Sequence, residues 1–98
     1  MSSETYGPDV PSGPYVLFVE GHGERVSAAL RDLLSAVAGM PGCLGAEVLA
    51  SPAQPGVTLL QARWPHDPPS VPIPAGARSW VFRVELALPD VETQARAR

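Results

Sequence analysis

The spacing of apolar residues predicts a strand followed by a helix in the first half of the chain. Residues 15–20 are aromatic and β-branched, are apolar on both faces, and run into a Gly-His-Gly turn at residues 21–23, which is typical of a strand that ends in a turn. Apolar positions then recur at helical spacing over residues 24–38. These positions are Val26, Leu30, Leu33, Leu34 and Val37. Gly39 is the expected C-cap, and Pro41 prevents the helix from continuing.

Three further extended segments follow the helix. Residues 43–50 and 57–64 flank a turn rich in proline and glycine, so we expect them to form an antiparallel hairpin. Residues 80–88 form the fourth predicted strand, which has one apolar face. That face comprises Trp80, Phe82, Val84, Leu86 and Leu88.

The prolines mark the connections between these segments, because proline cannot donate to a ladder and breaks helix interiors. Twelve prolines occur in the chain, and five of them fall within residues 65–74. This density excludes a helix after the third strand. Residues 68–72 can adopt an extended polyproline conformation, which would allow the loop to dock on another protein.

The order of elements predicts an α+β fold in which one main helix covers a four-stranded antiparallel sheet. Four strands spaced ~4.8 Å apart make a sheet about 19 Å wide, whereas a helix with its side chains is about 10–12 Å wide. The first and third strands are apolar on both faces, which is typical of a sheet that is covered on both sides. We therefore expect a symmetric homodimer that packs sheet against sheet.

Length and composition fit a single small domain. The chain has 98 residues, of which 45% are hydrophobic, and a formal net charge of -3. We expect one domain over residues 15–89, with flexible tails at 1–14 and 90–98. No secretory leader is evident, and no apolar run approaches the ~18 residues of a membrane span, so no membrane partner is expected.

The charged and sulfur-containing residues exclude several classes of function. Lysine and arginine number 7 against 10 acidic residues, so the chain lacks the basic surplus of a nucleic-acid-binding protein. All seven basic residues are arginine, which excludes Schiff-base chemistry on lysine. The single cysteine, Cys43, cannot form an intrachain disulfide, and we interpret it as a small buried hydrophobe in a cytoplasmic protein.

The segment after the predicted helix links the chain to a known family. Residues 40–49 read Met-Pro-Gly-Cys-Leu-Gly-Ala-Glu-Val-Leu, follow an amphipathic helix and precede a strand that ends in Trp64. Together these features resemble the antibiotic biosynthesis monooxygenase (ABM) domain over residues 15–64. The resemblance implies a ferredoxin-like fold of order β-α-β-β-loop-β that forms a dimeric α/β barrel.

The resemblance also implies a chemistry. Oxygenases of this family act on aromatic polyketides and related phenols without metal or flavin, because a deprotonated, electron-rich substrate can itself reduce oxygen. Relatives follow the third-strand tryptophan with a second helix that walls the pocket. The proline-rich residues 65–74 exclude that helix here, so the chain resembles a shortened variant with a shallower pocket. The haem-degrading branch depends on an asparagine, and this chain has none.

Trp64 is the residue that the resemblance carries over. Its indole N–H would serve as a polar handle in the pocket, and the alternative is a core tryptophan at a strand end. His66 beside Asp67 offers a base and the group that orients it, although sequence neighbours on such a loop are more often a solvated pair. His22, between two glycines, lies at a pocket mouth or simply in a surface turn.

Two pairs of polar residues on the strands allow two interpretations each. Arg83 and Glu85 share one face of the last predicted strand, where they would hold a phenolate and take a proton. The alternative, which we favour, is an ion pair across strands or across a dimer. Gln61 and Arg63 on the third strand invite the same two interpretations. Trp64, Arg83 and His66 are therefore the candidate catalytic residues.

No cofactor is expected from the sequence. His22, Cys43 and His66 show no metal-ligand spacing, and no phosphate-binding or dinucleotide motif is present. The favoured hypothesis is a small dimeric protein of secondary (polyketide) metabolism that binds a hydrophobic aromatic metabolite, as a cofactor-independent monooxygenase or a cyclase-type enzyme. The alternative is a non-catalytic dimeric ligand-binding or accessory protein.

Overall fold

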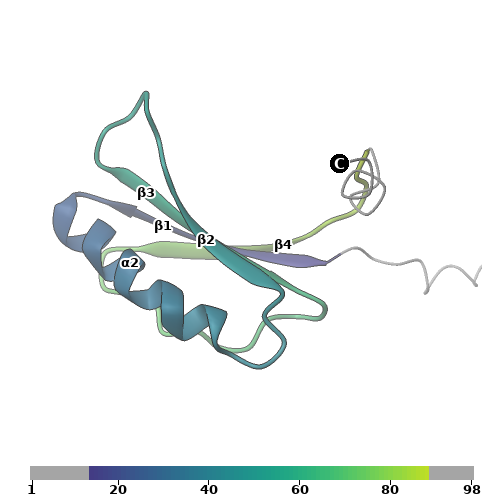
Figure 1. Ribbon diagram of the computed structural model, residues 1–98. Coiled ribbons are helices and arrows are strands. Elements are labelled where there is room, and N and C mark those ends of the chain that lie inside the picture. Colours follow the sequence, from purple (N-terminus) through teal and green to yellow (C-terminus); the bar gives the residue numbers. More distant parts are fainter. Residues whose placement is uncertain (1–13, 89–98) are drawn as a thin grey trace, which may run out of the picture.

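The computed structural model describes residues 14–88, which form a four-stranded antiparallel sheet with one long helix on one side (Figure 1). The elements are β1 (Tyr15–His22), α2 (Glu24–Ala38), β2 (Gly45–Ala50), β3 (Val57–Trp64) and β4 (Arg78–Arg83). The strand order is β2-β3-β1-β4. This arrangement confirms the predicted α+β, ferredoxin-like fold of order β-α-β-β-loop-β. The predicted tails lie outside the described residues, apart from Pro14.

The helix forms where the apolar spacing predicts it and packs closely on the sheet. Leu30 and Val37 are fully buried, and α2 packs on β1, β2 and β3. Contact at β1 is so close that a Cβ atom on Gly21 would lie 2.5 Å from the Val26 Cγ1 atom. Gly21 therefore sets how closely the helix approaches the first strand, because larger residues at this position would collide with it.

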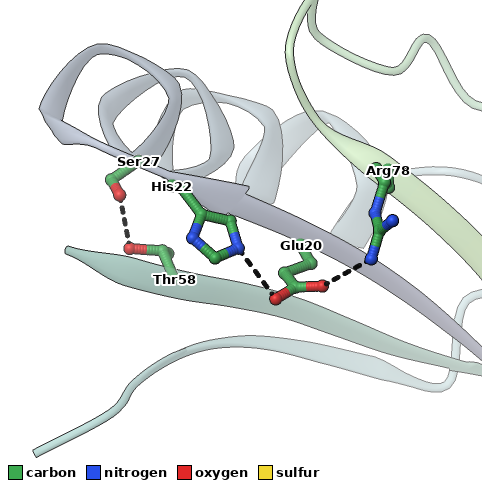
Figure 2. Close-up of polar contacts among 5 residues, drawn as sticks. All are labelled: Glu20, His22, Ser27, Thr58 and Arg78. Carbon is green, nitrogen blue, oxygen red and sulfur yellow. Dashed lines mark hydrogen bonds and ion pairs between the residues drawn. The ribbon is translucent and has the colours of Figure 1, made fainter. Parts of the chain in front are cut away.

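A buried hydrogen bond also joins the helix to the sheet. The Thr58 hydroxyl donates to the Ser27 Oγ atom over 2.6 Å, and both residues are buried (Figure 2). The apolar core surrounds this pair, between the sheet and α2. Its members are Leu17, Val19, Leu30, Val37, Leu60, Ala62 and Trp64. Mutual hydrogen bonding allows two polar groups to lie in this core without the cost of an unpaired buried group.

The opposite side of the sheet, which we call the open face, carries no helix of the described residues (Figure 1). Alternation along the paired strands assigns to it Val16, Phe18, Glu20 and His22 of β1, Gly45, Glu47 and Leu49 of β2, Val57, Leu59, Gln61 and Arg63 of β3, and Arg78, Trp80 and Phe82 of β4. Both apolar and charged side chains lie on this face. Phe18 and Phe82 contact each other edge to face, with ring centroids 5.7 Å apart.

An extended segment of residues 65–77, which we call the proline strap, connects β3 to β4 and contains no helix. Because β3 and β4 are both antiparallel to β1, they run parallel to each other, and the strap must return along the whole sheet. It passes on the same side as α2 (Figure 1). Every third residue from position 68 is half-buried, and the rest of the strap is exposed. The half-buried residues are Pro68, Val71, Pro74 and Ala77.

The three-residue period of burial is that of a polyproline II helix. The strap therefore turns one ridge toward the domain, where Val71 and Ala77 pack against the core, and the other two toward solvent. This confirms that the segment after Trp64 is irregular and not helical. The strap covers the part of the sheet that a single helix is too narrow to reach.

The fourth strand is shorter than predicted and begins earlier. Its predicted bounds, 80–88, are wrong: β4 comprises Arg78–Arg83. The strand pairs with β1, whose first residue Tyr15 lies opposite Arg83, and the next backbone bond runs from the Val84 N–H to the Pro14 carbonyl. Pro14 has no N–H to return a bond, so the ladder stops there.

The second strand also begins later than predicted, at Gly45 and not at Cys43. The Cys43 backbone N–H donates to the Met40 carbonyl in a turn, so this N–H forms no hydrogen bond of the sheet. The bounds predicted for the helix, 24–38, and for the third strand, 57–64, are confirmed. Among residues 14–88, no helix is long and apolar enough to cross a membrane.

Candidate functional site

Trp64 ends β3 on the side of the sheet that faces α2. It is 1% exposed, and its indole Nε1–H finds no hydrogen-bond acceptor among the described residues. An indole nitrogen is a donor only, so it cannot be satisfied by another donor. A buried polar group without a partner costs about 1–3 kcal/mol, and such groups in folded proteins call for an explanation. Trp64 is therefore a core residue whose indole N–H has no acceptor among the described residues.

A small hollow lies at this end of the sheet. It has a volume of about 270 Å³ and is open to solvent on one side. Its lining comes from the turn after α2, the end of β3 and the start of the proline strap. The lining residues are Pro41, Gly42, Trp64, Pro65, His66, Asp67 and Pro69. The hollow is slightly smaller than the ~300–1,000 Å³ that is usual for ligand sites. A shallow pocket is what we expect for a chain in which residues 65–74 form no second helix.

Strand register places two further polar side chains on the row of Trp64. Tyr15 pairs with Trp64 on one side and with Arg83 on the other, so the three residues share a row and a face. Arg83 is exposed and lies two strands away, roughly 10 Å from Trp64 at the usual strand spacing. The structure therefore joins Trp64 and His66 at one hollow and leaves Arg83 outside its lining.

Tyr15 is a candidate that the sequence interpretation missed. It is half-buried, packs against the core, and pairs with Trp64 in the register of β1 with β3. The sequence feature that could have pointed to Tyr15 is its position as the first residue of an apolar strand, directly after Pro14. Only the pairing of β1 with β3 shows that Tyr15 and Trp64 are neighbours, because 49 positions separate them in sequence.

His66 and Asp67 are both exposed at the start of the strap. No hydrogen bond or ion pair joins them in the part of the chain that the structure describes. A base and its orienting carboxylate would have to lie within about 2.6–3.2 Å of each other. Their arrangement is that of two separate groups at the rim of the hollow, where each can reach a ligand from solvent.

The two strand pairs named from sequence behave differently. Gln61 and Arg63 both donate to Glu47 on the open face: Gln61 Nε2 lies 2.8 Å from Glu47 Oε2, and Arg63 Nη1 lies 3.0 Å from the same oxygen. These contacts agree with the interpretation of Gln61 and Arg63 as partners in polar contacts across strands. Arg83 and Glu85 are both exposed, Glu85 lies beyond the end of β4, and no ion pair joins them within residues 14–88.

The other residues considered from sequence lie away from the hollow. His22 ends β1, where its Nε2 atom lies 3.0 Å from Glu20 Oε2 (Figure 2). Cys43 is half-buried and packs against the core. Within the described residues, no group of three or more histidine, cysteine, aspartate or glutamate side chains lies close enough together to hold a metal ion.

These positions define what the hollow can do chemically. The free donor of Trp64 suits an acceptor oxygen, such as a carbonyl or a phenolate, and the proline rings suit an apolar ring. His66 lines the hollow at its rim, and an imidazole is the side chain that most often serves as a general base. The site therefore fits a small aromatic molecule that bears an oxygen.

Comparison with known proteins agrees with this geometry. The sequence model of the family described as antibiotic biosynthesis monooxygenase matches residues 17–68, just over half of the chain. The match runs from β1 to the lining of the hollow and includes Trp64 and His66, whereas most of the proline strap and β4 lie beyond it. No curated protein and no solved structure matches the chain. The chain belongs to the antibiotic biosynthesis monooxygenase family.

Proposed function

We propose that this protein binds a small oxygen-bearing aromatic metabolite in the hollow at Trp64 and oxygenates it without a cofactor, or assists a related cyclisation, in cytoplasmic secondary (polyketide) metabolism. The observation that carries the proposal is the buried Trp64 Nε1–H, which has no acceptor among the described residues and belongs to a side chain that lines an apolar hollow. A ligand oxygen would satisfy this donor. The family of the chain supports the class of reaction.

The chemistry needs only the substrate and molecular oxygen. For an anthrone, loss of a ring C–H proton gives an enolate, which transfers electrons to O₂. One oxygen atom becomes the new carbonyl of the quinone, and the other leaves as water with two hydrogens from the substrate. Trp64 would donate to the enolate oxygen and stabilise its charge, and His66 would accept the proton. Arg83, on the same row, would add positive charge at longer range.

The test is the oxidation of an anthrone by wild type and by Trp64→Phe, followed by oxygen consumption. The variant keeps an aromatic ring and loses the donor together with part of the ring volume, so we expect turnover to fall at least tenfold, in line with the ~10²–10³ loss seen when one donor to a developing oxyanion is removed. Trp80→Phe is the matched control, because Trp80 lies on the open face. Equal rates for the wild type and Trp64→Phe would remove Trp64 from the mechanism.

A second function is favoured by a separate observation. The strap replaces the helix that walls the pocket in relatives, and His66 and Asp67 are exposed and not joined to each other. These features suit a protein that binds a metabolite without transforming it, as an accessory subunit. Native mass spectrometry of freshly purified protein distinguishes the two: a retained organic mass with no oxygen consumption favours the accessory function.

We also propose that the functional unit is a homodimer that packs through the open face. The aromatic side chains Phe18, Trp80 and Phe82 gather on this face, and Phe82 is 56% exposed. Apolar surface of this kind on a sheet without a covering layer is typical of an interface. Family membership supports the proposal, since small-molecule-binding dimers are common among its members.

A further inference from the structure

The proline strap presents to solvent a repeating pattern of side chains that the proposed function does not use. Every third residue from 68 to 77 is half-buried, and the residues between them form two exposed ridges. One ridge carries Pro69 and Pro72, and the other carries Ser70 and Ile73. Because a polyproline II helix repeats every three residues, neighbouring side chains of one ridge lie about 9 Å apart along the strap.

The exposed ridges lie apart from both interactions proposed above. The strap passes on the side of the sheet that carries α2, so its ridges stay accessible when two copies pack through their open faces (Figure 1). The Trp64 hollow is lined by strap residues from the first part only, none of them beyond Pro69. The outer surface of residues 70–76 is therefore free to contact something else.

The backbone of the strap is as available as its side chains. Within residues 14–88, no backbone N–H donates to a carbonyl of residues 65–73. The strap has few donors to offer in return, because residues 68, 69, 72 and 74 are proline and lack an N–H. A partner that adds a β-strand needs both donors and acceptors along the edge it joins, so this surface suits a partner that supplies donors only.

The strap is already held in the conformation that such a partner would bind. Val71 and Ala77 of its inner ridge pack against the core, and Pro68 and Pro74 are half-buried. The prolines leave little backbone entropy to be lost on binding. A ligand segment that is ordered in advance loses less of its contact energy to ordering, so even a small contact area can give measurable affinity.

A single charge at one end gives this surface a direction. Asp67 is exposed where the ridges begin, and no ion pair engages it within residues 14–88. Residues 68–77 contain no charged side chain. A polyproline II helix presents similar ridges in either direction, so the carboxylate of Asp67 is the group that can fix the orientation of a bound partner, through a cation on that partner.

We propose that the outer ridges of the strap dock in a groove of another protein that is lined by tyrosine and tryptophan rings, with a lysine or arginine beside the end that receives Asp67. The proline rings of the strap pack on the aromatic rings of the groove, and Ile73 fills a space between them. Indole N–H and phenolic O–H groups of the groove donate to the carbonyls that the chain leaves unused. This contact does not depend on a metabolite at Trp64.

Isothermal titration calorimetry of the full chain with an EVH1 domain tests the proposal. The domain is chosen for a lysine or arginine beside its aromatic groove, which takes polyproline II segments. We expect a Kd of roughly 10–100 µM, in keeping with a small transient contact. A free oligoproline peptide, which occupies the same groove, should displace the protein. Absence of binding, or binding that oligoproline does not displace, overturns the proposal.

Variants of the outer ridges locate the contact. Pro72→Ala and Ile73→Ser should each weaken binding at least fivefold, and unchanged affinity in either would contradict the proposal. Pro52→Ala is the matched control, because Pro52 is an exposed proline in the β2–β3 turn, and it should bind as the wild type does. If Pro72→Ala fails to fold, Ile73→Ser decides. Neither residue lines the Trp64 hollow, so anthrone oxidation should be unchanged in both variants.

The charge of Asp67 tests the chemistry of the groove. Asp67→Asn should bind the EVH1 domain at least threefold more weakly. An increase in salt from about 50 mM to about 500 mM should weaken binding of the wild type more than that of the variant. An SH3 domain chosen for acidic residues beside its groove should bind the wild type at least tenfold more weakly than the EVH1 domain does. Equal binding of the two domains would overturn the proposal.

Discussion

At the scale of single residues, Gly21 and Trp64 show two opposite consequences of close packing. Gly21 has no side chain because the helix occupies the space in which a Cβ atom would lie. Trp64 has a large side chain that fills the core, but its one polar atom finds no acceptor within residues 14–88. The first residue sets how closely the helix approaches the sheet, and the second has the donor on which the proposed ligand site depends.

Gly21→Ala should destabilise the protein by about 1–3 kcal/mol, the usual cost of forcing a methyl group into a packed core. The new Cβ would lie 2.5 Å from the Val26 Cγ1 atom and 3.1 Å from the Leu30 Cδ1 atom. Urea unfolding followed by circular dichroism measures the change. Gly39→Ala is the control, since its nearest neighbour would lie at 3.4 Å, an ordinary contact. A Gly21→Ala variant as stable as the wild type would show that the helix can shift outward freely.

At the scale of elements, the proline strap is the connection that sets this chain apart from the second helix implied by the family resemblance. It joins two parallel strands, a task that usually falls to a helix. Proline fixes φ in advance and has little backbone entropy to lose, so an extended strap can be ordered with few hydrogen bonds of its own. Its anchoring then depends on the residues of its half-buried ridge.

Val71→Ser should therefore loosen the strap, whereas Ile73→Ser should not. Val71 packs against the core, and removal of its methyl groups is expected to cost about 1–2 kcal/mol. Ile73, on an outer ridge, is 36% exposed. Limited proteolysis within residues 65–77, together with thermal melting, reports both changes. Equal protection of the two variants would contradict a strap held by its half-buried ridge.

At the scale of the whole molecule, the two faces of the sheet differ in what covers them. The side toward α2 holds the core and the Trp64 hollow, and the open face holds aromatic side chains and the hydrogen bonds of Glu47. A sheet with one helix-covered face and one aromatic face suits association with a second copy.

Phe82→Arg should convert the proposed dimer into a monomer, because it buries an unpaired charge at the interface. Val81→Arg is the matched control: Val81 neighbours Phe82 in β4, is 42% exposed, and points to the other side of the sheet. Sedimentation velocity of the wild type and both variants measures the assembly. A wild type that sediments as a monomer would contradict the packing argument, and dissociation by Val81→Arg alone would place the interface elsewhere.

The local sequence determined most of the elements, because their signals lie within a few residues of one another. Periodicity located α2 and β3 to the residue, and the proline run excluded a second helix. The limits of β4 did not follow from its own residues. The apolar alternation continues to Leu88, but the ladder ends where β1 reaches Pro14, and a strand cannot extend beyond its partner.

The residues of the candidate site also fall into those that the local sequence indicated and those that only the tertiary structure showed. The sequence by itself singled out Trp64 and His66, since a motif and a loop placed them close together. Tertiary structure alone decided that the Trp64 donor has no acceptor in the described part of the chain, that Tyr15 and Arg83 lie on its row, and that Glu47 accepts from Gln61 and Arg63 on the open face. Such neighbours are set by the register between strands that lie far apart in sequence, and register depends on how the whole sheet packs against its helix.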